Sequence, residues 1–221
     1  MKLLITGATG MVGSEVVRQA LVQNEIEAIF VLTRRPLSIK HQKINEIIHS
    51  DFLNYSGLEE IFKQCDACIW ALGIPQAWVT KEEYHVITYD YTLAAANAMI
   101  AANPLIRFLF VSGGGADSTE KSRITFAREK GKTENALQQL NLTSLIITRP
   151  GGIQPIVKPE KAPFSYRLVY PLFPLLKIIM PGQMITSVEL AKVILYLVKN
   201  GSDEIILENR ELKRIYKERR L

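Results

Sequence analysis

The feature that most constrains this chain lies near its beginning, where glycines follow a short apolar segment. Residues 2–6 are typical of a buried strand, and residues 13–23 carry apolar side chains at helical spacing. Between them runs Thr6-Gly7-Ala8-Thr9-Gly10-Met11-Val12-Gly13. Glycines at this spacing allow a sharp turn and a close approach of backbone amides to a pyrophosphate, which the N-terminus of the next helix attracts. The sequence therefore predicts that residues 6–13 bind the pyrophosphate of a dinucleotide.

The rest of the chain alternates between strand-like and helix-like segments. Strands are expected at residues 28–33, 44–49, 67–72, 106–111, 144–148 and 203–207. Helices are expected over 58–62 with Ser56 as the N-cap, over 80–102 with Thr80 and Glu83 as a capping box, and over 122–140 and 186–200. Buried strands that alternate with helices form a parallel sheet covered on both faces. We therefore predict an α/β fold with a doubly wound, Rossmann-like and mainly parallel sheet.

The end of the second expected strand bears on which dinucleotide binds. A site that prefers NAD usually has an acidic residue about 20 positions after the glycine turn, where it bonds the ribose 2′-hydroxyl. This chain has Leu32-Thr33-Arg34-Arg35 there, with no carboxylate. A guanidinium can bind a 2′-phosphate with two hydrogen bonds and lie against the adenine. Arg34 and Arg35 therefore favour NADP(H) over NAD(H).

Length and proline content determine the predicted domain organisation. A chain of 221 residues is in the range of one domain. Prolines gather between Pro150 and Pro181, where the alternation of strands and helices stops. We predict a single NAD(P)-binding domain over 1–221, in which residues 152–185 form a small C-terminal cap on the substrate side.

The positive charge of the chain is concentrated at its C-terminal end. The net charge is +5, and residues 210–221 hold six Lys and Arg but two Glu, so the remainder is nearly neutral. A basic segment can meet nucleic acid or an acidic membrane. We favour instead a solvated last helix with Leu212, Ile215 and Tyr216 packed inward. Neither nucleic acid nor membrane is expected as a partner, whereas a protein partner and the choice between monomer and homodimer stay open.

Two further patterns bear on location and metal binding. No apolar run reaches the about 18 residues of a membrane-spanning helix, and the N-terminus lacks the apolar region of a signal peptide, so a cytoplasmic location is expected. Cys65 and Cys68 are spaced C-x-x-C, but they fall at the end of a helix and in a strand, where core packing is the favoured interpretation. The three histidines have no paired spacing, and no metal site is predicted.

Together these segments resemble the short-chain dehydrogenase/reductase superfamily in its atypical, epimerase-like branch. Within that branch the chain is most similar to the group of thirty-kilodalton Tat-interacting oxidoreductases. The matching segments after the glycine turn are Asp51-Phe52, Val111-Ser112 with Gly115-Ala116-Asp117, Lys130-Gly131 with Glu134, Arg149-Pro150-Gly151 and Leu207-Glu208-Asn209.

The resemblance implies a role for several strand-end residues. Asp51 and Phe52 would lie at the adenine, and Ala71, Leu72 and Gly73 would run along the ribose and pyrophosphate. Ser112 would match the active-site serine, and Lys130 the lysine that bonds the nicotinamide ribose. Pro150 and Gly151 would border the nicotinamide.

The chain departs from this superfamily at its catalytic tyrosine. The usual element is Tyr-x-x-x-Lys, in which the lysine charge lowers the pKa of a phenol on the same helix face. The matching stretch here is Phe126-Ala127-Arg128-Glu129-Lys130, and phenylalanine has no ionisable group. None of the eight tyrosines has a lysine four residues later. The usual acid and base is therefore missing.

Three interpretations follow and stay open at this point. The chain is an oxidoreductase of a small carbonyl or hydroxyl substrate that obtains its proton from Ser112, Tyr166 or water. Alternatively, it is a non-catalytic protein that binds NADP(H) and signals through its bound state. The third interpretation is a non-redox interaction role that uses the basic C-terminal segment.

Overall fold

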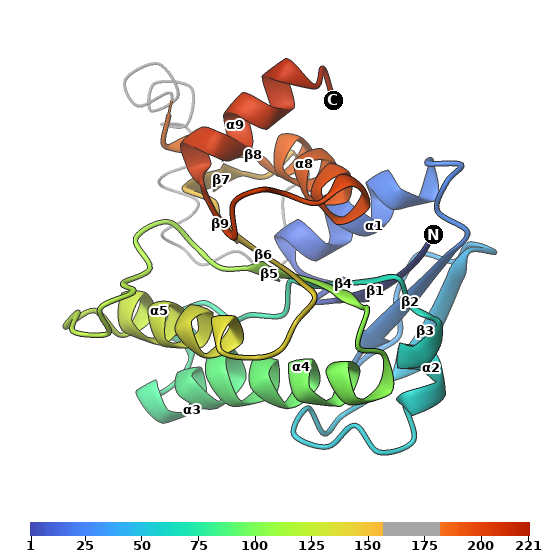
Figure 1. Ribbon diagram of the computed structural model, residues 1–221, viewed down its shortest axis with the longest axis horizontal. Coiled ribbons are helices and arrows are strands. Elements are labelled where there is room, and N and C mark those ends of the chain that lie inside the picture. The colour runs from blue at the N-terminus through green and yellow to red at the C-terminus, as the bar shows by residue number, and fades with distance from the viewer. Residues whose placement is uncertain (157–181) are drawn as a thin grey trace.

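The computed structural model describes residues 1–156 and 182–221, and its central feature is a parallel sheet of seven strands (Figure 1). The strand order is β3-β2-β1-β4-β5-β6-β9, and every neighbouring pair is parallel. The chain starts in the centre, builds outward to β3, and crosses over to place β4 on the other side of β1. This topology confirms the predicted doubly wound, Rossmann-like sheet. The strands are β1 (Lys2–Thr6), β2 (Ala28–Thr33), β3 (Ile44–Ile48), β4 (Ala67–Trp70), β5 (Arg107–Val111), β6 (Ser144–Arg149) and β9 (Ile206–Glu208).

Helices cover both faces of this sheet (Figure 1). One face carries α1 (Met11–Leu21), α8 (Ser187–Asn200) and α9 (Asn209–Glu218). The opposite face carries α2 (Glu59–Gln64), α3 (Lys81–His85), α4 (Tyr91–Ala102) and α5 (Thr125–Gln138). Successive residues of a strand point to opposite faces, so Leu3 and Ile5 join the core under α1 while Leu4 joins the core under α4. The inner strands β1, β2, β4, β5 and β6 are therefore largely buried on both faces, as is typical of a parallel sheet, whereas the edge strand β3 is partly exposed.

The capping box that the sequence predicts at Thr80 is present, and a second one begins α8. The Thr80 hydroxyl accepts the Glu83 amide at 3.1 Å, and the Glu83 carboxylate accepts the Thr80 amide at 2.9 Å. The same pair of bonds joins Thr186 and Glu189 at the start of α8. The predicted helix over 80–102 is not uniform, because a π-helical turn, η2 (Val86–Asp90), separates α3 from α4.

Two helices begin later than the sequence predicts. Ser56 does not cap α2, because its hydroxyl donates to Asn54 Oδ1 at 2.7 Å and the helix begins at Glu59 without a side-chain cap. Helix α5 begins at Thr125 rather than at Ser122. The Asp117 carboxylate binds the Ser122 amide at 2.7 Å and holds that residue in the preceding loop.

The predicted cap over residues 152–185 falls mostly outside the described residues. Its two ends form a small parallel sheet of β7 (Gly152–Gln154) and β8 (Met184–Thr186). Tyr166, considered above as a proton source, lies in the part of the chain that the structure does not describe. A short 3₁₀ helix, η1 (Gln76–Trp78), follows β4.

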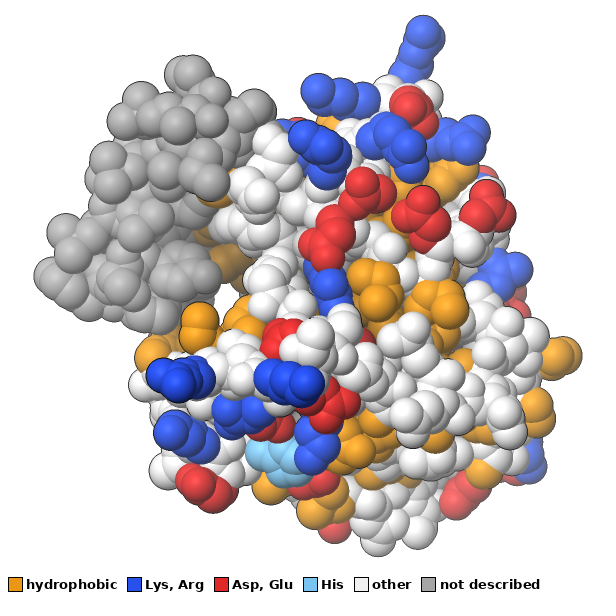
Figure 2. All heavy atoms as spheres, turned by 60° about the vertical axis from the view of Figure 1, so that its left-hand side comes forward, with side chains coloured by type: hydrophobic (Ala, Val, Ile, Leu, Met, Phe, Trp, Pro, Cys, Tyr) orange, Lys and Arg blue, Asp and Glu red, His pale blue; other side chains and the backbone are white. Residues whose placement is uncertain are grey.

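The basic C-terminal segment is helical and docked on the body, as the sequence predicts. Leu212 is fully buried, and Ile215 and Tyr216 pack against the core around α1 and α8. Basic side chains of α9 lie together on the outer surface, at the top of the view in Figure 2. In the described parts of the chain, no helix is long and apolar enough to cross a membrane.

Both cysteines are buried and have free thiols, which confirms their assignment to the core. Burial raises the pKa of Cys65 to about 12 and raises the pKa of Cys68 well above its ordinary value. Thiols with such pKa values are not activated nucleophiles.

Candidate functional site

The glycine turn between β1 and α1 is closely packed against the loop after β4 and against itself. Gly7 adopts φ +66°, which favours glycine, and its carbonyl oxygen accepts the Gly10 amide at 2.8 Å. A Cβ at Gly7 would lie 2.3 Å from the Ala71 carbonyl oxygen, and one at Gly13 would lie 2.2 Å from the Gly7 carbonyl oxygen. The turn therefore requires glycine at both positions.

Helix α1 begins immediately behind this turn with an N-terminus suited to an anion. Its N-cap is Gly10, which offers no side-chain cap, and its first turn holds no acidic residue. The amides of that turn therefore lack side-chain partners and carry the positive end of the helix dipole. Thr9 and Gly10 are exposed, Met11 and Val12 are half-buried, and Ala8 is buried. A bare glycine turn at a helix N-terminus fits a pyrophosphate.

The loop after β4 lies directly beside the turn. The buried Thr6 hydroxyl accepts the Leu72 amide at 3.2 Å and so ties the end of β1 to this loop. Gly73 is exposed, and a Cβ there would meet nothing within 4 Å. The structure thus brings Ala71, Leu72 and Gly73 next to the glycine turn, on the carboxyl edge of the sheet.

Arg34 and Arg35 follow β2, the immediate neighbour of β1, at the same edge of the sheet. Both are exposed, and the Thr33 hydroxyl donates to the Arg35 carbonyl oxygen at 2.9 Å, which shapes this corner. Neither guanidinium is paired with a carboxylate of residues 1–156 or 182–221. Two guanidinium groups without a carboxylate partner in these ranges therefore lie beside β1, the strand that leads into the glycine turn.

Asp51 and Phe52, which follow β3, occupy different environments. Asp51 is exposed, and its carboxylate accepts the Leu53 amide at 3.0 Å. The Phe52 ring is 1% exposed and packs against Trp70 and Tyr91 in the core. Asp51 is thus the member of the pair whose side chain reaches the surface.

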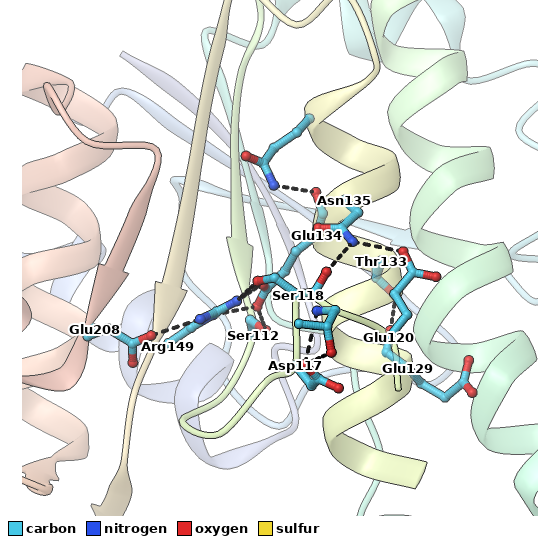
Figure 3. A network of polar contacts seen from close by, with 12 residues as sticks. Ser112, Asp117, Ser118, Glu120, Glu129, Thr133, Glu134, Asn135, Arg149 and Glu208 are labelled. Carbon is cyan, nitrogen blue, oxygen red and sulfur yellow. Dashed lines mark hydrogen bonds and ion pairs between the residues drawn. The ribbon is translucent and has the colours of Figure 1, made fainter. Parts of the chain in front are cut away.

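A buried polar network lies at the carboxyl ends of β5 and β6 (Figure 3). The Ser112 hydroxyl donates a hydrogen bond to the Glu134 carboxylate, which is fully buried in α5. Arg149 binds the same carboxylate from β6, with Nε at 3.1 Å from both oxygens. The guanidinium also bonds Glu208 at 2.8 Å and Ser118 at 2.7 Å. Chiefly its hydrogen bonds to Glu134 raise the pKa of Arg149, so the guanidinium keeps its charge.

Lys130 lies one turn before Glu134 and is also buried. Its Nζ donates to the Val111 carbonyl oxygen at 3.2 Å and lies 4.6 Å from the centre of the Phe110 ring. Burial lowers the pKa of Lys130 to about 8, against the opposing effect of the Glu134 charge. A lysine with this pKa gains and loses its proton near physiological pH.

Phe126 lies four residues before Lys130, at the position where the resemblance leads us to expect a tyrosine. Its Cζ would lie 2.6 Å from a Cβ built on Gly113, so the ring packs against the backbone just after Ser112. The helix thus brings the Phe126 ring and Lys130 to the end of β5, and the ring carries no exchangeable proton.

Pro150 and Gly151, after β6, are fixed by their neighbours. The Pro150 carbonyl oxygen accepts the Gly114 amide at 2.7 Å. Asn209, which is 4% exposed, accepts the Gly151 amide at 2.9 Å and donates to the Gly182 carbonyl oxygen at 2.7 Å. Asn209 therefore links Gly151, which follows β6, to Gly182, which precedes β8.

Three residues that bind parts of this site were not predicted as site residues from the sequence, namely Glu134, Arg149 and Asn209. The spacing of Lys130 and Glu134 places both on one helix face, which is a usable signal. Arg149 and Asn209 come from β6 and α9, and no local pattern indicates that Arg149 binds Glu134 or that Asn209 binds Gly151.

The chain matches a family described as NAD(P)H-binding over residues 7–200. It is 32% identical over 161 residues to leucinostatins biosynthesis cluster protein T of Purpureocillium lilacinum. It is 30% identical over 156 residues to the mitochondrial protein FMP52 of Meyerozyma guilliermondii. These matches cover 70% and 68% of this chain but 58% and 64% of the two relatives, so the chain spans less than two thirds of their length.

Solved structures with the same fold include two nucleotide-binding enzymes. The enzyme WbmF of Bordetella bronchiseptica in complex with NAD⁺ has a TM-score of 0.70 at 11% identity, covering 98% of this chain and 77% of that one. A UDP-glucose 4-epimerase of Thermotoga maritima has a TM-score of 0.69 at 15% identity, covering 98% and 82%. At these identities the similarity shows the fold alone.

The family match includes all three glycines of the turn and reaches the end of α8, so that it contains strands β2 to β6 of the sheet on which the site is built. The chain therefore belongs to the NAD(P)H-binding family.

Proposed function

We propose that this protein binds NADP(H) and acts as an oxidoreductase on a small carbonyl or hydroxyl substrate. The observation that carries the proposal is the position of Ser112 and buried Lys130 at the end of β5, on the sheet edge that holds the glycine turn. In parallel α/β sheets this edge is where dinucleotides bind. The family membership supports the cofactor class.

Different residues of the chain would bind different parts of such a cofactor. Residues 6–13 and the N-terminus of α1 would hold the pyrophosphate, and residues 71–73 would run along the ribose. Pro150 and Gly151 would border the nicotinamide. When bound, the cofactor supplies a hydride for the substrate carbon. Ser112 would orient the substrate oxygen, beside the positive charge of Lys130.

The preference for NADP(H) over NAD(H) is a separate step of the proposal. It is supported by Arg34 and Arg35, which are exposed and without carboxylate partners in the described ranges. A guanidinium that gains a phosphate forms charge-assisted hydrogen bonds of about 1.5–3 kcal/mol. Each arginine in contact with a 2′-phosphate would thus contribute roughly 10- to 150-fold in affinity.

The test is a calorimetric titration of nucleotide-free protein with NADPH and with NADH. We expect tight NADPH binding in the wild type, weakened at least tenfold by Arg34→Ser or Arg35→Ser, with NADH binding unchanged. Lys63→Ser, an exposed cation on α2, is the matched control and should alter neither affinity. Equal affinity for both nucleotides would contradict the arginine argument, and binding of neither would remove the whole proposal.

A second candidate function is a non-catalytic NADP(H) sensor, and Phe126 is the observation that favours it. The two candidates separate by turnover. The oxidoreductase oxidises NADPH when a reducible carbonyl such as 9,10-phenanthrenequinone is added, and Ser112→Ala slows it. The sensor binds NADPH, so that its melting temperature rises, yet reduces no member of an aldehyde, ketone and quinone panel.

Placement within the superfamily and in the cell is part of the same proposal. We infer membership of the Tat-interacting oxidoreductase group from the segments that include Asp51-Phe52 and Arg149-Pro150-Gly151.

A cytoplasmic location is retained as the proposal, with mitochondria as the alternative because several relatives are named as mitochondrial. Cell fractionation with antibodies against this chain distinguishes the two.

A further inference from the structure

The absence of a phenol at position 126 leaves the source of the substrate's proton unassigned. Three polar side chains converge at the carboxyl end of β5, namely Ser112, Lys130 and Glu134 (Figure 3 shows two of them). Their hydrogen bonds decide which of them has a proton to exchange.

Ser112 and Glu134 are unsuited to donate a proton. The Ser112 hydrogen is already committed to the Glu134 carboxylate. That carboxylate accepts further bonds from Arg149, whose Nε lies 3.1 Å from both oxygens, so both oxygens already serve as hydrogen-bond acceptors. The lone pairs of the Ser112 oxygen remain, so Ser112 serves a substrate as an acceptor of a hydrogen bond.

Lys130 is the remaining candidate, and its hydrogens are not all committed. An ammonium has three N–H donors, and among the described residues one is accounted for by the bond to the Val111 carbonyl oxygen. Of the nearby charged side chains, Glu134 faces Lys130 from its own helix and Arg149 lies beyond Glu134. The neighbouring Glu129 turns away to His85 at 2.7 Å and to Arg128 at 3.2 Å.

We propose that Lys130 itself exchanges the proton with the substrate oxygen, while Ser112 accepts a hydrogen bond from the resulting hydroxyl. This inference rests on the proposed oxidoreductase function. In the reductive direction the carbonyl carbon gains a hydride and the C=O π electrons move to the oxygen. The oxygen takes a proton from Lys130 Nζ, and the neutral amine recovers one from water. Oxidation of an alcohol runs through the same steps in reverse.

The surroundings of Lys130 favour this proton exchange. An acid or base works best when its pKa is near the working pH, and burial brings the pKa of Lys130 to about 8. The Phe126 ring packs on Gly113 and contributes no competing acid. Two opposite pH dependences follow: reduction needs the ammonium, so its kcat/KM falls above about pH 8, whereas oxidation needs the amine, so its kcat/KM rises up to that pH.

The kinetic experiment compares wild type, Lys130→Arg and Lys132→Arg in the reduction of 9,10-phenanthrenequinone by NADPH across pH. Arginine keeps the positive charge but does not release a proton at these pH values. We expect Lys130→Arg to lower kcat about 100-fold or more, with NADPH affinity by calorimetry within a few-fold of wild type. Lys132, which lies 4.6 Å over the Tyr89 ring, is the matched control on the same helix and should behave as wild type.

A second readout needs no turnover. Reductive ¹³C-methylation followed by an NMR titration of the free protein should show one lysine signal that titrates near pH 8 and is missing from Lys130→Arg. Full activity of Lys130→Arg with an unchanged pH profile would overturn the inference and leave the oxidoreductase function standing. NADPH binding without quinone reduction by the wild type would overturn both the inference and the oxidoreductase, while leaving the cofactor site. Absence of NADPH binding would remove the cofactor site itself.

Discussion

Replacing Gly13 by alanine tests the close packing between α1 and β1 on which the glycine turn depends. The new Cβ would lie 2.2 Å from the carbonyl oxygen of Gly7 and 2.6 Å from its carbonyl carbon. Non-bonded heavy atoms settle at roughly 3.5 Å, so α1 or the turn must move by about 1 Å. The Gly7 carbonyl is also the acceptor of the Gly10 amide at 2.8 Å, which limits how the turn can relax.

Two effects of this substitution oppose each other. Alanine is favoured over glycine inside a helix by about 1 kcal/mol, whereas overpacking costs about 1–3 kcal/mol. Since the clash is with backbone atoms and no flexible side chain can yield, we expect the second effect to dominate. The free energy of unfolding should fall by about 1–2 kcal/mol. Displacement of the amides that face the pyrophosphate should weaken NADPH binding at least tenfold, which is about 1.4 kcal/mol.

Urea denaturation and calorimetric titration with NADPH measure the two quantities separately. Ser14→Ala is the matched control, because Ser14 is the next residue of α1 and is exposed. It should change neither the urea midpoint nor the NADPH affinity. If Gly13→Ala is more stable than wild type and binds NADPH with unchanged affinity, the close approach of α1 to the turn is not a requirement and the reasoning fails.

Four further outcomes are expected. Glu134→Gln breaks the buried pair with Arg149 and should lower the free energy of unfolding in urea by about 3 kcal/mol; a loss below about 0.5 kcal/mol would contradict the role given to the network. Phe126→Tyr places a phenol four residues before Lys130, with its oxygen on the Cζ atom that lies against Gly113, and should raise the rate of quinone reduction at least about tenfold. Because burial raises the pKa of Cys65 to about 12, native protein at about pH 8 should be inert to a disulfide reagent that labels it fully in urea. Arg214→Glu on the outer face of α9 should shift the free energy of unfolding by less than about 0.5 kcal/mol, and a larger loss in thermal melting would show that this face is structural.

The parts of the fold that could be predicted are those in which local signals and tertiary packing agree. The glycine turn shows in sequence because strand, turn and helix are adjacent in the chain. The capping box at Thr80 joins residues three positions apart, and it formed as expected. Strands buried on both faces read as continuous apolar runs, which is why the parallel sheet was predictable.

Other features depend on contacts between distant segments. Asp117 delays the start of α5 by binding the Ser122 amide, although Ser122 alone is a plausible N-cap. The core position of the Phe52 ring is another such feature, because it depends on the rings of Trp70 and Tyr91, while the assignment of Phe52 to the adenine stays a prediction. The link from Ser112 through Glu134 to Arg149 joins β5, α5 and β6, and no short-range spacing encodes it.

The packing of α8 along α1 has a consequence for how the chain is made. Both helices belong to one hydrophobic cluster, although most of the chain separates them. At about 5–20 residues per second, roughly 10 to 35 s pass on the ribosome between the synthesis of α1 and that of α8. During that time Val16, Val17 and Ala20 lack the apolar cover that Leu190 and Ile194 later provide. The helix that carries the anion-binding turn is thus synthesised well before the helix that covers it, so its apolar face stays without this cover during that interval.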